Sequence, residues 1–276
     1  MPCMIRLLTA QGLQPVSYSA DSLAAAAAFE AHDGVYTITN TYNTFQVLKF
    51  DAHLDRLEDS ARREQIQLRL DRVGLRAALR QMIAEAGYGD VRFRITIERQ
   101  NPQALILSLE PFAPLAAEIR ARGVRCITAG SAARHHPEAK TINWLHDRKQ
   151  IEQSLSPGIY TALLLSPEGH ILEGLSSNFY AILEGELRSA GAGVLPGIAQ
   201  QVVYTVAPHI LPLRKVAVNV RDLPRLDEAF ITSSSRGVLA VVEIDGQQIG
   251  AGTPGVKTLA ISQAYNHWVQ MHLEDL

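Results

Sequence analysis

The sequence predicts a mixed α/β and α+β protein of two domains, and three observations lead to that prediction. Residues 35–50 and 91–112 are rich in β-branched and aromatic residues that alternate with a period of two, as in an antiparallel sheet. Residues 52–66 and 72–86 repeat apolar side chains at helical spacing. The stretch PFAP at 111–114 has the composition of a linker. We therefore expect an N-terminal domain over 1–112, a linker over 113–122 and a C-terminal domain over 123–276.

The N-terminal domain is expected to contain three helices and four strands. Ser22 is placed to cap a helix through the alanines, which Asp33 and Gly34 would end. Strands over 35–42 and 44–50 meet at Asn43 in a hairpin. Helices follow over 52–66 and 72–86, and strands over 91–99 and 104–112 complete the antiparallel sheet.

The C-terminal domain begins with a predicted strand over 123–130 and a helix over 141–156. A meander of short strands follows, with turns at 167–169 and 184–185. A turn and a helix are expected over 195–207, and a strand that ends in hydroxyl side chains over 227–235. An Asp-Gly pair predicts a hairpin in 241–250, and a helix begins near 254.

Composition narrows the class of protein. A chain of 276 residues that is 47% hydrophobic can bury a sizeable core, and it is not disordered. The net charge of −2 supplies no basic field for nucleic acid or an anionic membrane. No signal peptide or membrane span is predicted, and Cys3 and Cys126 form neither a disulfide framework nor a zinc site. We expect a cytoplasmic protein.

Lys140 is the candidate nucleophile. It precedes an apolar helix in RHHPEAKTINWL, and only five of the 26 basic residues are lysines. A lysine amine that loses solvent has a lowered pKa and becomes nucleophilic, which is how Schiff-base lysines arise. The alternative is a solvated lysine at a helix start.

Other residues suggest an anion site and a carboxylate for a ring nitrogen. Glu173, at a strand end before Gly174, would keep an aromatic ring nitrogen protonated, or it is a polar turn residue. Pro196 and Gly197 begin a helix whose first amides can bind an anion. Arg56 and the hydroxyls of 232–235 can bind phosphate, although a solvated helix face and a strand-end turn explain them as well.

Other chemistries lack their patterns. The chain contains no G-x-S-x-G, H-E-x-x-H or G-x-x-x-x-G-K-[ST] segment. His135 and His136 are adjacent, without the spacing or third ligand of a zinc site, so no metal is expected. No stripe of aromatic and basic residues suggests RNA or single-stranded DNA binding.

The order of the motifs resembles one family. The segments are GVY at 34–36, HLDRLEDSA at 53–61, K-x-x-N at 140–143, EGLSSNFY at 173–180, LPGI at 195–198, and TSSS at 232–235 before VVEIDG at 241–246. This succession resembles the fold-type IV pyridoxal-phosphate (PLP) enzymes: branched-chain aminotransferases, D-amino-acid aminotransferases and aminodeoxychorismate lyases. The likeness runs from about Asp33 to Gly250, whereas the first thirty residues look unlike the family's opening strands.

The resemblance implies a role for each matched residue. Lys140 would form the Schiff base with PLP and move the proton between the substrate Cα and the cofactor's C4′. Glu173 would bind the pyridine nitrogen. The phosphate would be held by Arg56, the amides of Ile198 and Ala199, and Ser234. Ala199 stands where the family often has Thr.

Substrate residues are implied less specifically. Tyr36 would line the substrate side, and Trp144 stands where branched-chain enzymes carry Tyr. Asn40 stands where several relatives have Arg. Arg99 resembles the strand-end Arg of D-amino-acid aminotransferases, with Arg92 and Arg94 as competitors, and all three are alternatively edge-strand charges.

The resemblance thus implies a two-domain fold-type IV enzyme, with an N-terminal antiparallel sheet and a β-barrel-like C-terminal domain. It would transfer an amino group from an amino acid or amine to a 2-oxo acid, as a homodimer. One alternative is 4-amino-4-deoxychorismate lyase, which uses the same cofactor but releases pyruvate without an acceptor. Another is a non-catalytic binding descendant, against which the presence of both Lys140 and Glu173 argues. A nucleic-acid module is disfavoured by the net charge.

Overall fold

The computed structural model describes residues 2–130 and 134–276, which form two compact units. Unit 1 comprises Met1–Ala113, Ala139–His146 and His272–Leu276, and unit 2 comprises Pro114–Glu138 and Asp147–Met271. The chain therefore passes between the units four times. The predicted boundaries at 112 and 123 remain a prediction, and the stretch between them contains the helix α4 (Ala117–Arg122).

Unit 1 is built on a seven-stranded antiparallel sheet in the order β16-β4-β3-β5-β6-β1-β2. Its elements are β1 (Met4–Thr9), β2 (Gly12–Pro15), α1 (Leu23–Ala26), η1 (Ala27–Phe29), β3 (Gly34–Tyr42), β4 (Gln46–Leu48), α2 (Phe50–Arg63), α3 (Arg72–Ala86), β5 (Val91–Glu98), β6 (Leu105–Pro111) and β16 (Leu273–Asp275). The antiparallel sheet, the hairpin at Asn43 and the helix over 72–86 confirm the sequence-based expectations.

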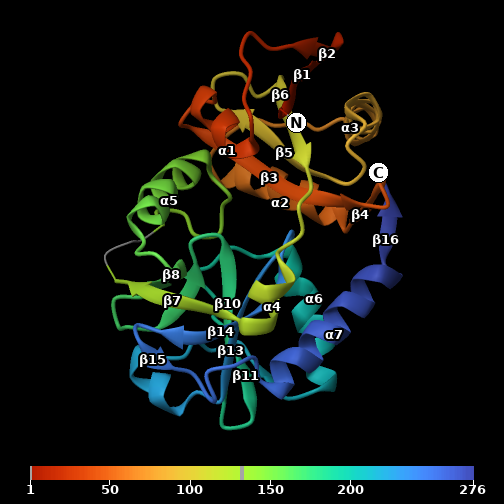
Figure 1. Cartoon of the computed structure of the whole chain (residues 1–276). Coiled ribbons are helices and arrows are strands. Elements are labelled where there is room, and N and C mark those ends of the chain that lie inside the picture. Colours follow the sequence, from red (N-terminus) through yellow and green to blue (C-terminus); the bar gives the residue numbers. More distant parts are fainter. Residues whose placement is uncertain (1, 131–133) are drawn as a thin grey trace. The chain divides into compact units, whose positions relative to one another are not determined.

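The two faces of this sheet follow from the period of two along β5. Phe93 and Ile95 point to one face and are fully buried in a core shared with α2 and α3. Figure 1 shows α2 running alongside β3. Arg94 and Thr96 point to the other face, where both bind the carboxylate of Glu30, which follows η1.

Residues 4–15 correct one expectation. They form β1 and β2, which pair with each other in a local hairpin, from Arg6 opposite Pro15 to Thr9 opposite Gly12. The strand β1 also pairs with β6 along five residues, from Met4 opposite Leu109 to Leu8 opposite Leu105. The chain therefore does have opening strands, and β6, about a hundred residues away, joins them to the sheet.

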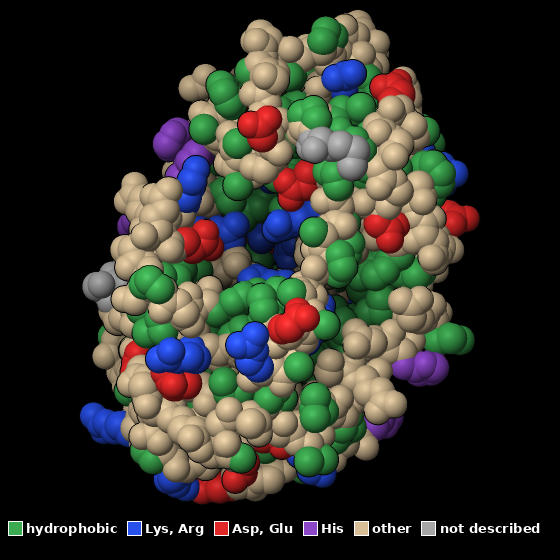
Figure 2. All heavy atoms as spheres, in the orientation of Figure 1, with side chains coloured by type: hydrophobic (Ala, Val, Ile, Leu, Met, Phe, Trp, Pro, Cys, Tyr) green, Lys and Arg blue, Asp and Glu red, His purple; other side chains and the backbone are tan. Residues whose placement is uncertain are grey.

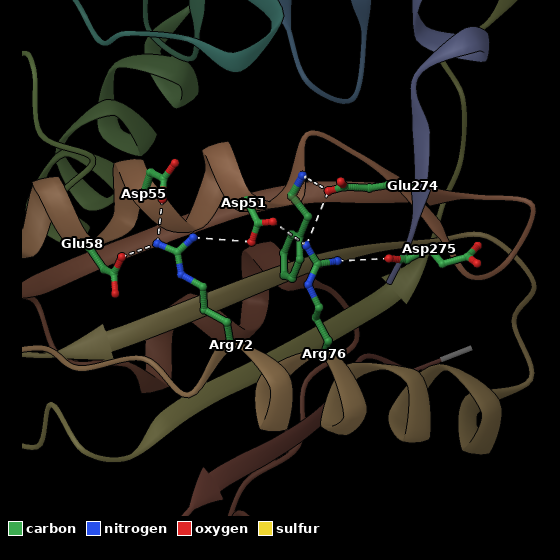
Figure 3. A network of polar contacts seen from close by, with 8 residues as sticks. Asp51, Asp55, Glu58, Arg72, Arg76, Glu274 and Asp275 are labelled. Atoms are coloured by element: carbon green, nitrogen blue, oxygen red, sulfur yellow. Dashed lines mark hydrogen bonds and ion pairs between the residues drawn. The ribbon is translucent and has the colours of Figure 1, made fainter.

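A second strand that the sequence pattern does not indicate is β16, at the other end of the chain. It pairs with β4, and Leu276 beyond it is buried in the core of unit 1. Figure 3 shows Arg76 donating to the backbone oxygen of Asp275, at 3.0 Å, and pairing with Glu274 and Asp51. Arg72, one turn earlier on α3, pairs with acidic residues of α2. These contacts attach the last residues to α2 and α3.

Unit 2 is built on a nine-stranded sheet. Besides α4, its elements are β7 (Val124–Ala129), most of α5 (Ile142–Ser154), β8 (Ile159–Leu165), β9 (Ile171–Gly174), β10 (Ser177–Leu183), β11 (Glu186–Arg188), α6 (Ile198–Val206), η2 (Ala207–His209), β12 (Leu213–Arg214), η3 (Val220–Arg225), β13 (Glu228–Ser233), β14 (Gly237–Ile244), β15 (Gln247–Gln248) and α7 (Val256–Met271).

Six of these strands close into a ring, which confirms the barrel-like prediction. The pairing runs β10-β13-β14-β7-β8-β9, and β9 then pairs with β10 again through Glu173 opposite Asn178. Closure leaves these strands without a free edge. Figure 1 shows α6 and α7 side by side, and both helices contact β13.

The surface agrees with the near-neutral composition. Figure 2 shows acidic and basic side chains interspersed over most of the face drawn. Within residues 2–130 and 134–276, no helix is both long enough and apolar enough to cross a bilayer.

Candidate active site

Lys140 lies in unit 1, where both of its backbone polar groups are bonded to other elements. Its amide donates to the Ser60 hydroxyl on α2 at 3.0 Å, and its carbonyl accepts from the Tyr36 amide on β3 at 3.0 Å. The next residue, Thr141, forms an isolated bridge with Val35. The helix predicted from 141 begins at Ile142. Lys140 is thus held on the sheet of unit 1 rather than in the barrel.

The Lys140 amine lies over an aromatic ring. Its Nζ is 4.7 Å from the ring centroid of Tyr36, which is 2% exposed. An ammonium or amine at this distance is attracted to the ring face. Tyr36, which the resemblance places on the substrate side, therefore lies beside the candidate nucleophile.

Arg56 lies on the buried face of α2, because residues 53, 56, 57 and 60 fall on one side of a helix. Arg56 as a whole is 8% exposed, and its guanidinium donates to the Thr37 hydroxyl at 3.5 Å. The same hydroxyl is 3.0 Å from Nδ1 of His53, which is 1% exposed. Burial, then the charges of Arg56 and Lys140, hold the pKa of His53 well below 6.5. His53 is therefore neutral beside two cationic side chains.

Glu173 is the penultimate residue of β9 in unit 2 and is 3% exposed. Its Oε1 accepts from Nη1 of Arg134 at 2.6 Å, and its Oε2 accepts from the Leu195 amide at 3.2 Å. The Arg134 side chain is itself only 6% exposed. Arg134 was not predicted from the sequence. The only feature that could have indicated it is its place six residues before Lys140.

The start of α6 forms a tight turn against β10. Ile198 and Ala199 are the first helical residues and are buried, and their amides belong to the turn that has no acceptor within the helix. Asn178 donates to the Leu195 carbonyl at 2.9 Å. A Cβ at Gly197 would lie 2.0 Å from Oδ1 of Asn178, so the backbone approaches this side chain closely.

Thr232 and Ser233 are the last two residues of β13, and Ser234 and Ser235 follow in the turn. Thr232 contacts the Tyr180 hydroxyl at 3.2 Å, and Ser233 accepts from Arg236 at 2.7 Å. Ser234 follows in the turn before β14 and is half-buried. Arg236 also binds Ser176, so it connects this turn with the start of β10.

Each of the three arginines considered for a substrate carboxylate has an acidic partner in unit 1. Arg99 binds Asp33 at 2.6 Å and lies 3.5 Å from Glu64. Arg94 is buried with Glu30, and Arg92 lies 3.8 Å from Glu110. A role of Arg99 in binding substrate stays a prediction, and it requires the exchange of those partners. Asn40 and Trp144 are both buried.

Sequence analysis missed the residues that join these groups, namely Thr37, His53, Ser60 and Arg134. For His53 and Ser60 the signal was present, because helical periodicity places them on the face of α2 that carries Arg56. Among residues 2–130 and 134–276, no group of three or more His, Cys, Asp or Glu side chains is arranged to hold a metal ion.

Unit 1 thus carries a lysine, a buried arginine and a neutral histidine, and unit 2 carries a buried acid and a helix start that can bind an anion. The chain belongs to the amino-transferase class IV family, whose model matches residues 34–244. It is accordingly an enzyme, a transferase.

Individual relatives agree with this assignment. The chain is 28% identical to a D-alanine aminotransferase of Listeria innocua over 258 residues, 88% of each protein. It is 27% identical to a branched-chain-amino-acid aminotransferase of Pseudomonas aeruginosa over 254 residues, 84% of this chain and 82% of the relative.

The fold matches solved structures across nearly the whole chain. A branched-chain amino acid aminotransferase of T.th., solved with pyridoxamine 5′-phosphate, superposes with a TM-score of 0.82, covering 98% of both chains at 21% identity. The enzyme of Thermoproteus uzoniensis, solved with norvaline, gives 0.81 at 20% identity and covers 100% of this chain and 99% of that one. The fold-type IV architecture is therefore confirmed.

Proposed function

We propose that this enzyme transfers an amino group from an amino acid or amine to a 2-oxo acid, with PLP bound covalently to Lys140. The observation that supports it best is the anchoring of Lys140. Its amide and its carbonyl are both bonded to elements of unit 1, and its amine lies over Tyr36. Names of the relatives suggest branched-chain amino acids or D-alanine as the class of donor.

The chemistry of the available donors fits PLP. In this proposal the phosphate is bound by Arg56, by the amides of Ile198 and Ala199 and by Ser234, which supply charge, helix-terminal N–H groups and a hydroxyl. A Cβ at Gly197 would collide with Asn178, so glycine allows the helix start to pack closely on this side chain. Glu173 is a buried carboxylate with capacity for a further donor, which suits a protonated ring nitrogen.

When bound, PLP supplies a ring that withdraws electrons from the substrate Cα–H bond. Lys140 would hold the cofactor through its Nζ and, when released by an amino substrate, would be the base for the substrate Cα proton. Tyr36 would orient that amine, because Nζ lies 4.7 Å from its ring centroid. Glu173 would hold a protonated ring nitrogen, and Arg134 compensates the charge of that buried carboxylate.

His53 contributes by remaining uncharged. Because its pKa lies well below 6.5, it adds no third positive charge next to Arg56 and Lys140. Its ring nitrogen and the Arg56 guanidinium both contact the Thr37 hydroxyl, which holds the guanidinium in one orientation. Arg56 is thereby prepared for an anion without reorganisation.

We further propose that the enzyme acts as a homodimer in the cytoplasm. The free thiols of Cys3 and Cys126, both buried, support a reducing compartment. Sedimentation of the PLP-loaded protein is expected to give twice the mass of the chain.

The test is a half-reaction without acceptor. PLP-loaded protein is mixed with L-leucine, L-valine, D-alanine, D-glutamate or 1-phenylethylamine, and the carbonyl product is measured. We expect one equivalent of product per site from at least one donor, and continuous turnover after addition of pyruvate or 2-oxoglutarate. Pyruvate released from 4-amino-4-deoxychorismate without an acceptor would instead indicate the lyase reaction. No product from any donor by protein that holds PLP on Lys140 would contradict transamination.

A further inference from the structure

Ser60 contacts the backbones of both Arg56 and Lys140 in unit 1. It is fully buried on α2, at 0% exposure. Its hydroxyl donates to the carbonyl of Arg56 at 2.8 Å, and the same oxygen accepts from the amide of Lys140 at 3.0 Å. One side chain therefore connects the backbone of Arg56 with the backbone of Lys140, which lies 80 positions beyond Ser60 in the sequence.

The bond from the Ser60 hydroxyl to the Arg56 carbonyl is common in helices, whereas the bond from the Lys140 amide to the same hydroxyl is not. Serines inside helices often donate to the carbonyl four residues earlier. Thr205 on α6 does so to Gln201 at 3.0 Å. A hydroxyl has one proton and two lone pairs, so after that donation it can still accept. Ser60 uses this capacity for the amide of Lys140, which lies immediately before the residue that bridges to β3.

Further backbone contacts at Lys140 and Thr141 come from the strand β3. Its carbonyl is bonded to Tyr36 and the following Thr141 bridges to Val35, and both partners belong to β3. Ser60 supplies the contact from α2, the helix that carries Arg56. The hydroxyl thus fixes the Lys140 backbone relative to that helix, whereas the β3 contacts fix it relative to the sheet.

We propose that Ser60 is a positioning residue, whose hydroxyl holds Lys140 at the separation from Arg56 that a rigid phosphorylated aldehyde requires. This inference rests on the proposed function. The phosphate and the aldehyde carbon of PLP are separated by a rigid ring, so the two groups that receive them must keep a fixed spacing. A misplacement of about 1 Å can cost about a hundredfold in rate.

The experiment measures attachment of PLP rather than turnover. Cofactor-free protein is mixed with PLP, borohydride is added at timed intervals, and label on the Lys140 peptide gives the rate of attachment. For Ser60→Ala we expect a rate at least about tenfold lower than for the unchanged protein. Ser108→Ala is the matched control. That hydroxyl is equally buried in unit 1, at 1% exposure, and has no hydrogen-bond partner in the described structure, so the unchanged rate is expected.

A double-variant cycle separates positioning from a purely structural role. In a Lys140→Ala background, noncovalent PLP affinity depends on Arg56 but not on the lysine side chain. If Ser60 acts through Lys140, adding Ser60→Ala to that background changes the PLP dissociation constant by less than about twofold. An equal loss of affinity with and without the lysine side chain would show that Ser60 only supports the helix, and it would overturn the inference.

A second variant, Ser60→Cys, covers the case in which Ser60→Ala is unstable. If Ser60→Ala does not fold, Ser60→Cys replaces it, because a thiol is a weaker hydrogen-bonding group. A rate for Ser60→Cys equal to that of the unchanged protein overturns the inference, and a lower rate together with an unchanged melting temperature supports it.

The same labelling experiment separates failure of this inference from failure of the proposed function. If the unchanged protein itself shows no label on Lys140, the proposed function fails. If label appears and Ser60→Ala matches the unchanged rate, only the positioning role fails.

Discussion

His53 illustrates, at the scale of a residue, how burial sets the charge near Lys140. Its pKa is lowered first by burial and then by Arg56 and Lys140. The unfolded chain therefore binds a proton near pH 6.5 that the folded chain does not bind until much lower pH. Because the unfolded state binds more protons, stability falls as the pH drops below about 6.5, by up to about 1.4 kcal/mol per pH unit.

We expect His53→Asn to remove this component of the pH dependence. Urea unfolding of the cofactor-free protein between about pH 5 and 8 measures it. The exposed His209→Asn is the control and should keep the original slope. An identical slope for His53→Asn would contradict the assignment of the proton to His53.

Glu173 provides the second prediction at this scale. Glu173→Gln keeps the shape of the side chain but cannot keep a proton on a ring nitrogen by its charge. We expect PLP still to attach to Lys140 while kcat falls by about a hundredfold or more. Glu168→Gln, an exposed change five residues earlier, should leave kcat unchanged. An undiminished kcat for Glu173→Gln would mean that another group protonates the ring.

At the scale of an element, the start of α6 depends on Gly197. Its φ of −73° suits any residue, so the requirement for glycine is the contact with Asn178 and not backbone strain. Asn178 binds Leu195, whose amide binds Glu173. The helix start and the acid are therefore linked through one loop.

Gly197→Ala is expected to push Asn178 away and to raise the PLP dissociation constant about tenfold, because about 1.4 kcal/mol of phosphate binding corresponds to that factor. Titration of cofactor-free protein with PLP measures it. Far-UV circular dichroism should stay unchanged. An unaltered dissociation constant would show that the phosphate does not use this helix start.

At the scale of the whole molecule, the chain ends return to unit 1. Leu276 is buried in its core, and Arg76 and Arg80 bind the last backbone carbonyls. Removal of residues 272–276 deletes a strand and a buried side chain. We expect the free energy of unfolding of unit 1 to fall by about 3 kcal/mol.

The two tryptophans allow each unit to be followed separately. Trp144 belongs to unit 1 and Trp268 to unit 2. In shortened chains that also carry Trp268→Phe or Trp144→Phe, fluorescence reports one unit at a time. The Trp144 signal should shift to lower urea and the Trp268 signal should not. Equal shifts of both signals would contradict the assignment of the chain end to unit 1.

Most of the fold could be predicted from local pattern. Helix α3 has the predicted bounds, because Asp71 caps its start and Gly87 its end. The strands β1 and β16 were not predicted: β6 and β4, with which they join the sheet, are distant in sequence, and the local pairing of β1 with β2 was overlooked. Closure of the barrel depends on the pairing of β9 with β10, and local periodicity does not report strand order.

The main residues of the candidate site could be predicted from the sequence, but the residues that contact and position them could not. Local residue patterns and the order of the motifs together indicated Lys140, Arg56 and Glu173. They did not indicate the roles of Ser60 and Arg134, which depend on the distant groups that these side chains contact. The acidic partner of Arg94 also lies far away in sequence, at Glu30, so an alternating strand pattern cannot distinguish a buried ion pair from a substrate ligand.

The most direct test of the account is the identity of the lysine that carries PLP. Purified protein is loaded with PLP, its visible absorption is recorded, and borohydride reduction is followed by peptide mapping. We predict a visible band and label on Lys140. Label on Lys49, Lys149, Lys215 or Lys257 instead, or a protein that stays colourless and unlabelled, would contradict it.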